Sequence, residues 1–119
     1  MLLTTGSLVG ETLLAAEKLK AKKIGSIVVN QNCLNKIDLE ILKPLLQKCE
    51  GRMVTNEDHQ VLLGLGAFVT HQLVQKGINV KVKSLGVLGE FGQSAYNAIE
   101  LYRKHGIDSD AVVRAAELI

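Results

Sequence analysis

Three consecutive residues, Glu57-Asp58-His59, carry the side chains of this chain best suited to chemistry. Carboxylates and an imidazole can act as general acids and bases, and the unperturbed pKa of histidine lies near neutrality. Because neighbouring side chains diverge, the three cannot all converge on one metal ion without an unusual loop. The spacing therefore yields no catalytic, cofactor-binding or metal-ligating set, and we favour a structural or interface role for His59 over catalysis.

Two glycines, Gly64 and Gly66, follow this acidic stretch where a helix should begin. The backbone amides of a first helical turn lack partners within the helix, so they could bind an anion or receive an acidic side chain from the preceding strand end. The alternative is that the glycines only let the helix pack closely, with no side chain in the way. The candidate interface or anion site comprises Glu57, Asp58, His59, Gly64 and Gly66.

The remaining candidates fit an autonomous hydrolase poorly. Ser7 or Ser94 could supply a nucleophile to His59, but neither lies in a nucleophile-elbow sequence. His71, inside the following helix, is expected at the surface, and His105 near a helix end offers a favourable cation to the helix dipole.

The composition indicates one globular domain spanning residues 1–119. Hydrophobic residues make up 47% and charged residues 22% of the chain, which excludes disordered and fibrous classes. The formal net charge is only +2, and the lysines of residues 18–23 have no aromatic neighbours for base stacking. We therefore expect no nucleic-acid partner and interpret the lysine cluster as a solvated helix end.

Cysteine usage and hydropathy predict a cytoplasmic location. Cys33 and Cys49 are too far apart for a CxxC motif and have no histidine at metal-ligand spacing, so we expect buried free thiols in a reducing compartment. No apolar run approaches membrane-spanning length, and the first residues lack the features of a signal peptide. No membrane partner is expected.

Strand and helix patterns alternate along the chain. The predicted fold class is α/β, a three-layer sandwich with a mostly parallel sheet of four to five strands and helices on both faces. The expected strands are 2–5, 24–29, 52–55 and 80–85, and the expected helices follow at 9–19, 39–49, 62–73, 94–105 and 109–119.

Several details can be predicted locally. We expect Ser7 and Asp38 to cap the first two helices, either Asp108 or Ser109 to cap the last, and Gly77 and Gly106 to end others. Strand 24–29 should be covered on both faces, strand 80–85 should lie near an edge, Leu62 should be buried by its helix, and Pro44 should produce a kink or a short leading turn.

Short motifs follow one another in order along nearly the whole chain. They are Thr5-Gly6-Ser7, Glu57-Asp58-His59, Gly64-Leu65-Gly66, Leu85-Gly86-Val87, Glu90-Phe91-Gly92-Gln93-Ser94, Glu100-Leu101 and Gly106-Ile107-Asp108. This ordered series resembles the C-terminal domain of transketolase. In that family a glycine pair usually stands where this chain has Leu63-Gly64, and Ser-Gly where it has Ser94-Ala95.

The resemblance implies a mixed sheet in a dimeric enzyme of the pentose phosphate pathway that moves two-carbon ketol units between sugar phosphates. Thiamine diphosphate and a divalent metal would be bound by other domains, so no cofactor is expected in this chain. Its expected partners are the remaining transketolase domains or a split partner subunit, in a homo-oligomer. The alternatives are the same domain of deoxyxylulose phosphate synthase or of a 2-oxo acid dehydrogenase beta subunit, or a free-standing anion-binding module.

Overall fold

The computed structural model describes residues 1–119, in which strands and helices alternate as far as the fourth strand and two helices follow. The elements are β1 (Leu2–Thr4), η1 (Gly6–Leu8), α1 (Val9–Ala21), β2 (Val28–Asn30), α2 (Leu39–Lys48), β3 (Arg52–Gln60), α3 (Leu65–Gln75), β4 (Lys81–Val87), α4 (Ala98–His105) and α5 (Ser109–Glu117).

The four strands form one sheet in the order β2-β1-β3-β4, and every pairing is parallel. The predicted α/β class is confirmed, whereas the mixed sheet implied by the resemblance does not occur within this chain. The predicted edge position of β4 is also confirmed. The prediction for residues 24–29 was wrong, because the strand is confined to β2, which lies at the opposite edge and is only half-buried.

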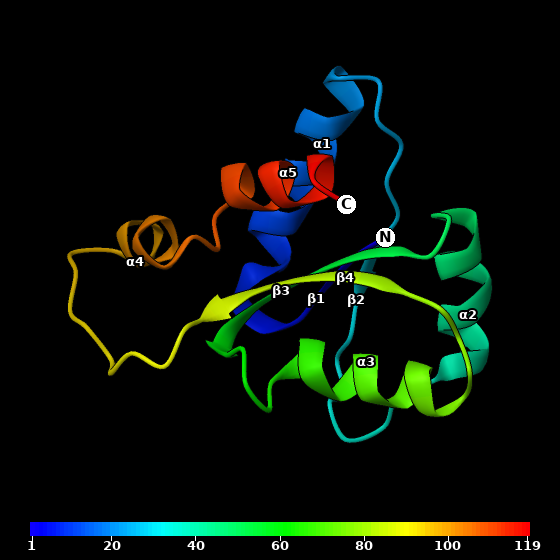
Figure 1. The fold of residues 1–119 in the computed structure, drawn as a ribbon. Helices are drawn as coiled ribbons and strands as arrows, with labels where there is room; N and C mark the ends of the chain where they lie inside the picture. The colour runs from blue at the N-terminus through cyan, green and yellow to red at the C-terminus, as the bar shows by residue number, and fades with distance from the viewer.

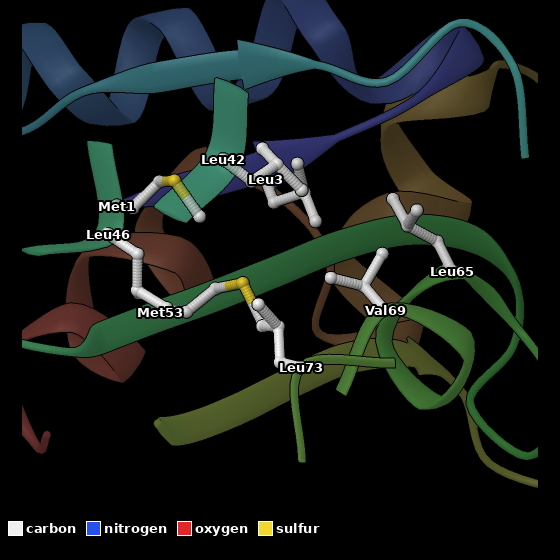
Figure 2. Close-up of a cluster of buried hydrophobic side chains, with 8 residues drawn as sticks. All are labelled: Met1, Leu3, Leu42, Leu46, Met53, Leu65, Val69 and Leu73. Carbon is white, nitrogen blue, oxygen red and sulfur yellow. The ribbon is translucent and has the colours of Figure 1, made fainter. Parts of the chain in front are cut away.

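Side-chain alternation along β1 and β3 builds a core on each face of the sheet. Leu3 and Met53 point toward α2 and α3, while Leu2 and Val54 point toward α1 and α5. Figure 2 shows the first cluster, in which side chains from α2 and α3 meet those of the sheet. Figure 1 shows α1 and α5 on one side of the sheet and α3 on the other, which confirms the three layers.

Most of the predicted helix ends are correct. Asp38 accepts hydrogen bonds from the amides of α2, and Asp108 does the same for α5. Gly77 and Gly106 follow α3 and α4 with φ of +68° and +64°, which glycine adopts at little cost. Helix α2 continues through Pro44, so the expected leading turn does not form a separate element.

Three local predictions were wrong. Ser7 lies in the 3₁₀ turn η1 and makes no cap for α1, because its hydroxyl is bonded elsewhere. Leu62 is 81% exposed, since α3 begins only at Leu65. The fourth helix begins at Ala98 rather than near residue 94, because the Asn97 side chain caps it there.

Both cysteines are free, but Cys33 is exposed and Cys49 is half-buried. The prediction of a buried thiol at Cys33 was wrong, because the polar loop between β2 and α2 that carries it lies at the surface. None of the helices has the length and apolar character needed to cross a membrane.

Residues 88–105, which we call the arm, leave the end of β4 as a loop and carry α4. No residue of α4 is buried, and Figure 1 shows this helix standing apart from the three layers. Phe91 and Tyr96 on the arm are almost completely exposed. The arm and the β3–α3 loop both lie at the carboxyl ends of the strands.

Candidate functional site

Strand β3 is longer than the sequence indicates and contains the whole acidic stretch. It runs from Arg52 to Gln60, so Glu57, Asp58 and His59 lie in the strand and not in the expected loop. Pairing with β4 is regular up to Asn56, shifts register, and resumes at Gln60 opposite Val87. Such an irregularity redirects side chains at the end of a strand.

Glu57 caps α3 from the neighbouring strand. Its completely buried carboxylate accepts one hydrogen bond from the Leu65 amide at 2.6 Å and another from the Gly66 amide at 2.9 Å. The residue before the helix, Gly64, has no side chain to provide a local cap. Two of the amides that could have bound an external anion, those of Leu65 and Gly66, are therefore already occupied by a carboxylate of this chain.

Gly64 and Gly66 permit this close approach of α3 to the sheet. A Cβ at Gly64 would overlap the Glu57 carboxylate. A Cβ at Gly66 would overlap the Thr55 hydroxyl oxygen and lie 2.6 Å from that of Ser84. The absence of a side chain at both positions is thus needed for the helix to reach Glu57 and the sheet.

Asp58 connects the end of β3 to η1 at the carboxyl edge of the sheet. Its Oδ2 accepts a hydrogen bond of 2.6 Å from the Ser7 hydroxyl in η1. Strands β1 and β3 are neighbours, but α1 and α3 lie on opposite faces, so this is the point where open α/β sheets commonly bind ligands. Here the crevice is bridged by a hydrogen bond within the chain.

His59 lies beside both carboxylates but is bonded to neither. Its Nδ1 is 3.8 Å from Glu57 Oε2, and its Nε2 is 3.7 Å from Asp58 Oδ1. The side chain is 55% exposed, and the two contacts are ion pairs only when the imidazole is protonated. No group of three or more His, Cys, Asp or Glu side chains in the chain is arranged to hold a metal ion.

His59 and Gln60 separate two surface hollows. The first, of about 410 Å³, is lined on its apolar side by Leu34, Leu62, Leu63, Leu65 and Phe68. The second, of about 460 Å³, lies against the arm and includes Asp58, Glu90, Phe91 and His105. Asp58, His59 and Gly64 thus border a continuous surface that is partly apolar, whereas Glu57 and Gly66 are buried and line neither hollow.

Two residues that the sequence analysis missed hold this region in place. The buried Asn56 donates from Nδ2 to the Ile107 carbonyl at 3.1 Å and to the Thr12 hydroxyl at 3.3 Å. Gln60 accepts from the Gly89 amide at 2.8 Å and donates to the Glu90 carbonyl at 3.0 Å, which ties the arm to β3. Asn56 stands at the start of a polar run in the sequence, so nothing there distinguishes it as a buried residue, and nothing indicates the partners of Gln60.

The serines and other histidines do not extend the site into a catalytic set. Ser7 donates to Asp58, and no hydrogen bond joins either Ser7 or Ser94 to His59. His71 is exposed on α3. The Nδ1 of His105 lies 3.7 Å from Glu90 Oε2, and the His105 side chain is mostly buried.

The molecule is thus a parallel α/β domain whose carboxyl-edge crevice is bridged by a hydrogen bond between two of its own side chains. Residues 1–112 match the family described as transketolase, C-terminal domain, and the chain belongs to that family. The resemblance noted in the sequence is therefore confirmed.

Several relatives support this assignment. A protein of Methanocaldococcus jannaschii named as a transketolase C-terminal section is 34% identical over 113 residues, covering 95% of this chain and 34% of the relative. The 6-deoxy-6-sulfo-D-fructose transketolase subunit SqwH of a Clostridium species is 34% identical over 118 residues, covering 97% of this chain and 35% of the relative. The solved structure described as a split gene transketolase, inactive beta4 tetramer, matches with a TM-score of 0.87 and 32% identity, covering 98% of this chain and 37% of that one.

This chain therefore spans about a third of the length of these relatives. The match therefore corresponds to one part of each of these longer chains.

Proposed function

We propose that this chain is the C-terminal domain, or a separately encoded subunit, of a transketolase-type enzyme that transfers two-carbon ketol units between sugar phosphates. Residues 1–119 act as one domain with a role in assembly, in a cytoplasmic enzyme of the pentose phosphate pathway. Family membership supports the proposal, as does the similarity to a named transketolase subunit and to a split-gene transketolase.

The observation that carries the assembly role is the pair of hydrogen bonds that the Glu57 carboxylate accepts from the first amides of α3. In many α/β enzymes, a helix start at the carboxyl edge supplies free amides to a phosphate. In this chain those amides bind Glu57, while Asp58 and Ser7 bridge the neighbouring crevice. Both features build a fixed surface at this edge rather than an open binding site.

The same arrangement fits thiamine diphosphate poorly. A diphosphate and its divalent metal require free backbone amides or cations together with oxygen ligands for the metal. The amides of Leu65 and Gly66 are taken by Glu57, and the acidic side chains form no metal-binding group. We accordingly assign the cofactor and the metal to the remaining domains or to a split partner subunit, and derive no catalytic step here.

The proposed partners are those remaining domains and further copies in a homo-oligomer. The split-gene relative is described as a tetramer of its beta chain, which supports assembly through subunits of this type. Glu57, Asp58, His59, Gly64 and Gly66 then belong to an interface region, in which Glu57 and the glycines shape the surface from beneath.

Reconstitution tests the proposal directly. The 119-residue chain is mixed with a chain that carries the thiamine-binding domains, and ketol transfer between sugar phosphates is measured alongside complex formation by sedimentation velocity. We expect a stable complex and activity that exceeds that of either component alone. If the two chains neither associate nor restore transfer, the assignment as a domain or subunit of such an enzyme is wrong.

A further inference from the structure

We infer that the carboxyl-edge surface is a docking site for an apolar surface with a rim of Lys or Arg, located on the thiamine-binding part of the enzyme. We define this surface as the residues lining the two hollows on either side of His59, with Leu63 and Phe91 as its anchors. The inference rests on the proposed function and assigns its partner to one face of the molecule.

Leu63 is the first argument for this surface. Its side chain is 97% exposed, and its backbone has a φ of +66°, in the left-handed region that favours glycine. A leucine at this position is therefore unfavourable for the isolated chain both in conformation and in solvation. Residues held in such conformations cluster at functional sites, and burial of the side chain by a partner would remove the unfavourable exposure.

The exposed apolar area is the second argument. Leu62 and Phe91 are 81% and 94% exposed, and Phe68 in the first hollow is 42% exposed. Complete burial of an aromatic side chain removes roughly 150–250 Å² from water. Leu62, Leu63 and Phe91 together therefore supply a large part of the roughly 800 Å² that each partner buries in a standard interface.

The two hollows form one surface because the same two residues, His59 and Gln60, line both. Gln60 also fixes the arm through hydrogen bonds to Gly89 and Glu90, so Phe91 is held beside the β3–α3 loop. A single partner can consequently contact Leu63 and Phe91 together.

The charges select the kind of partner. Asp58 and Glu90 are the only Asp, Glu, Lys or Arg side chains that line the two hollows. Two copies docked through this surface would bring identical carboxylates together, whereas a partner with Lys or Arg at its rim would be complementary. The occupant is therefore a different surface and not a second copy of this one.

Binding of variants to the chain with the thiamine-binding domains tests the inference. Leu63→Gly suits the backbone conformation and removes the anchor, and Phe91→Ser removes the second anchor from an exposed position. We expect each to weaken binding at least tenfold in isothermal titration calorimetry. Glu90→Lys should weaken it about fivefold, by an amount that falls as salt is added.

Leu118→Gln is the matched control, because Leu118 is 78% exposed at the end of α5 and lines neither hollow. It should change binding by less than twofold. Thermal unfolding of Leu63→Gly should show a melting temperature at or above that of the wild type, which separates the loss of binding from misfolding.

The outcomes separate the two proposals. Binding by the wild type with unchanged affinity for Leu63→Gly and Phe91→Ser overturns the docking surface and leaves the proposed function standing. Failure of the wild type itself to bind or to restore activity overturns the proposed function. The assignment of the partner is then overturned as well, because it rests on that function. Self-association of the chain that Leu63→Gly abolishes would show that a second copy occupies the surface, which also overturns the inference.

Discussion

In both α2 and α3, a carboxylate accepts hydrogen bonds from the first amides of the helix, but the two carboxylates come from different places in the chain. Asp38 immediately precedes α2, and its exposed side chain accepts from two amides at 3.1 and 3.2 Å. Glu57 lies eight and nine positions before its partners, is completely buried, and accepts at 2.6 and 2.9 Å. The first contact stabilises one helix end, whereas the second attaches a helix to the sheet and positions the loop between them.

Burial explains why the two caps should differ in strength. An exposed cap exchanges hydrogen bonds with water, so its removal leaves amides that water can satisfy. Removal of a buried, charged acceptor leaves amides without any partner. The difference between the two caps can be measured.

The largest effect is expected for Glu57→Ala. The variant loses two charge-assisted hydrogen bonds and leaves two buried amides unsatisfied, so the free energy of unfolding should fall by about 3 kcal/mol or more. Chemical denaturation followed by far-UV circular dichroism measures the change. Glu57→Gln keeps one oxygen acceptor and should lose about half as much. A loss below about 1 kcal/mol for Glu57→Ala would show that burial does not strengthen this cap.

The next largest loss of stability is expected for Gly66→Ala. The added Cβ would overlap Thr55 and crowd Ser84, which should push α3 away from the sheet and destabilise the fold by about 2 kcal/mol. Gly10→Ala is the matched control, because Gly10 lies in α1 and, apart from neighbouring residues and backbone of its own helix, no atom lies within 4 Å of the added carbon. That control should gain up to about 1 kcal/mol. Equal changes in stability for Gly66→Ala and Gly10→Ala would contradict the close approach of α3 to the sheet.

Asp38→Ala probes the exposed cap and should destabilise the fold by about 1 kcal/mol. The same denaturation experiment gives the value, and Asp38→Asn should recover most of the loss because its amide oxygen can still accept. If Asp38→Ala were as damaging as Glu57→Ala, the contrast between local and distant caps would disappear.

The smallest effect is expected for an exposed carboxylate in an ion pair, Asp110. The hydrogen bond from the Lys18 ammonium, together with its charge, lowers the pKa of Asp110 below its usual 3.8. The pair therefore contributes stability at pH values above the pKa that Asp110 has in the unfolded chain. That contribution is lost as the pH falls through the lowered pKa that Asp110 has in the folded chain. Any stability difference between the wild type and Asp110→Asn should shrink below about pH 4, as measured by melting temperatures across pH. A difference that grows on acidification would contradict this assignment.

The comparison of the two caps also explains what the sequence could predict. Asp38, Gly77 and Gly106 act on residues next to them, so local rules identified their roles correctly, and Asp108 is one of the two caps that those rules allowed for α5. The four parallel strands followed from the alternation of apolar segments. These features depend on short stretches of chain, and a short stretch is what a sequence pattern describes.

The errors arose where a residue interacts across the fold. Serine commonly caps helices, which is why Ser7 was predicted to do so. Its hydroxyl instead donates a hydrogen bond to Asp58, which lies 51 positions away. Leu62 fits a helical pattern, yet Glu57 fixes the start of α3 only at Leu65. The sequence indicated that an acidic side chain could reach the amides near Gly64 and Gly66, but choosing between that and an external anion required the register of β3 and α3.

The arm has a consequence for spectroscopy. The chain contains no tryptophan, and its two tyrosines, Tyr96 and Tyr102, both lie on this projecting segment. Intrinsic ultraviolet emission therefore monitors the arm and is insensitive to the aliphatic interior. A change in tyrosine fluorescence without a change in circular dichroism would report an event confined to that segment, such as contact with another protein, while the layers behind it stay folded.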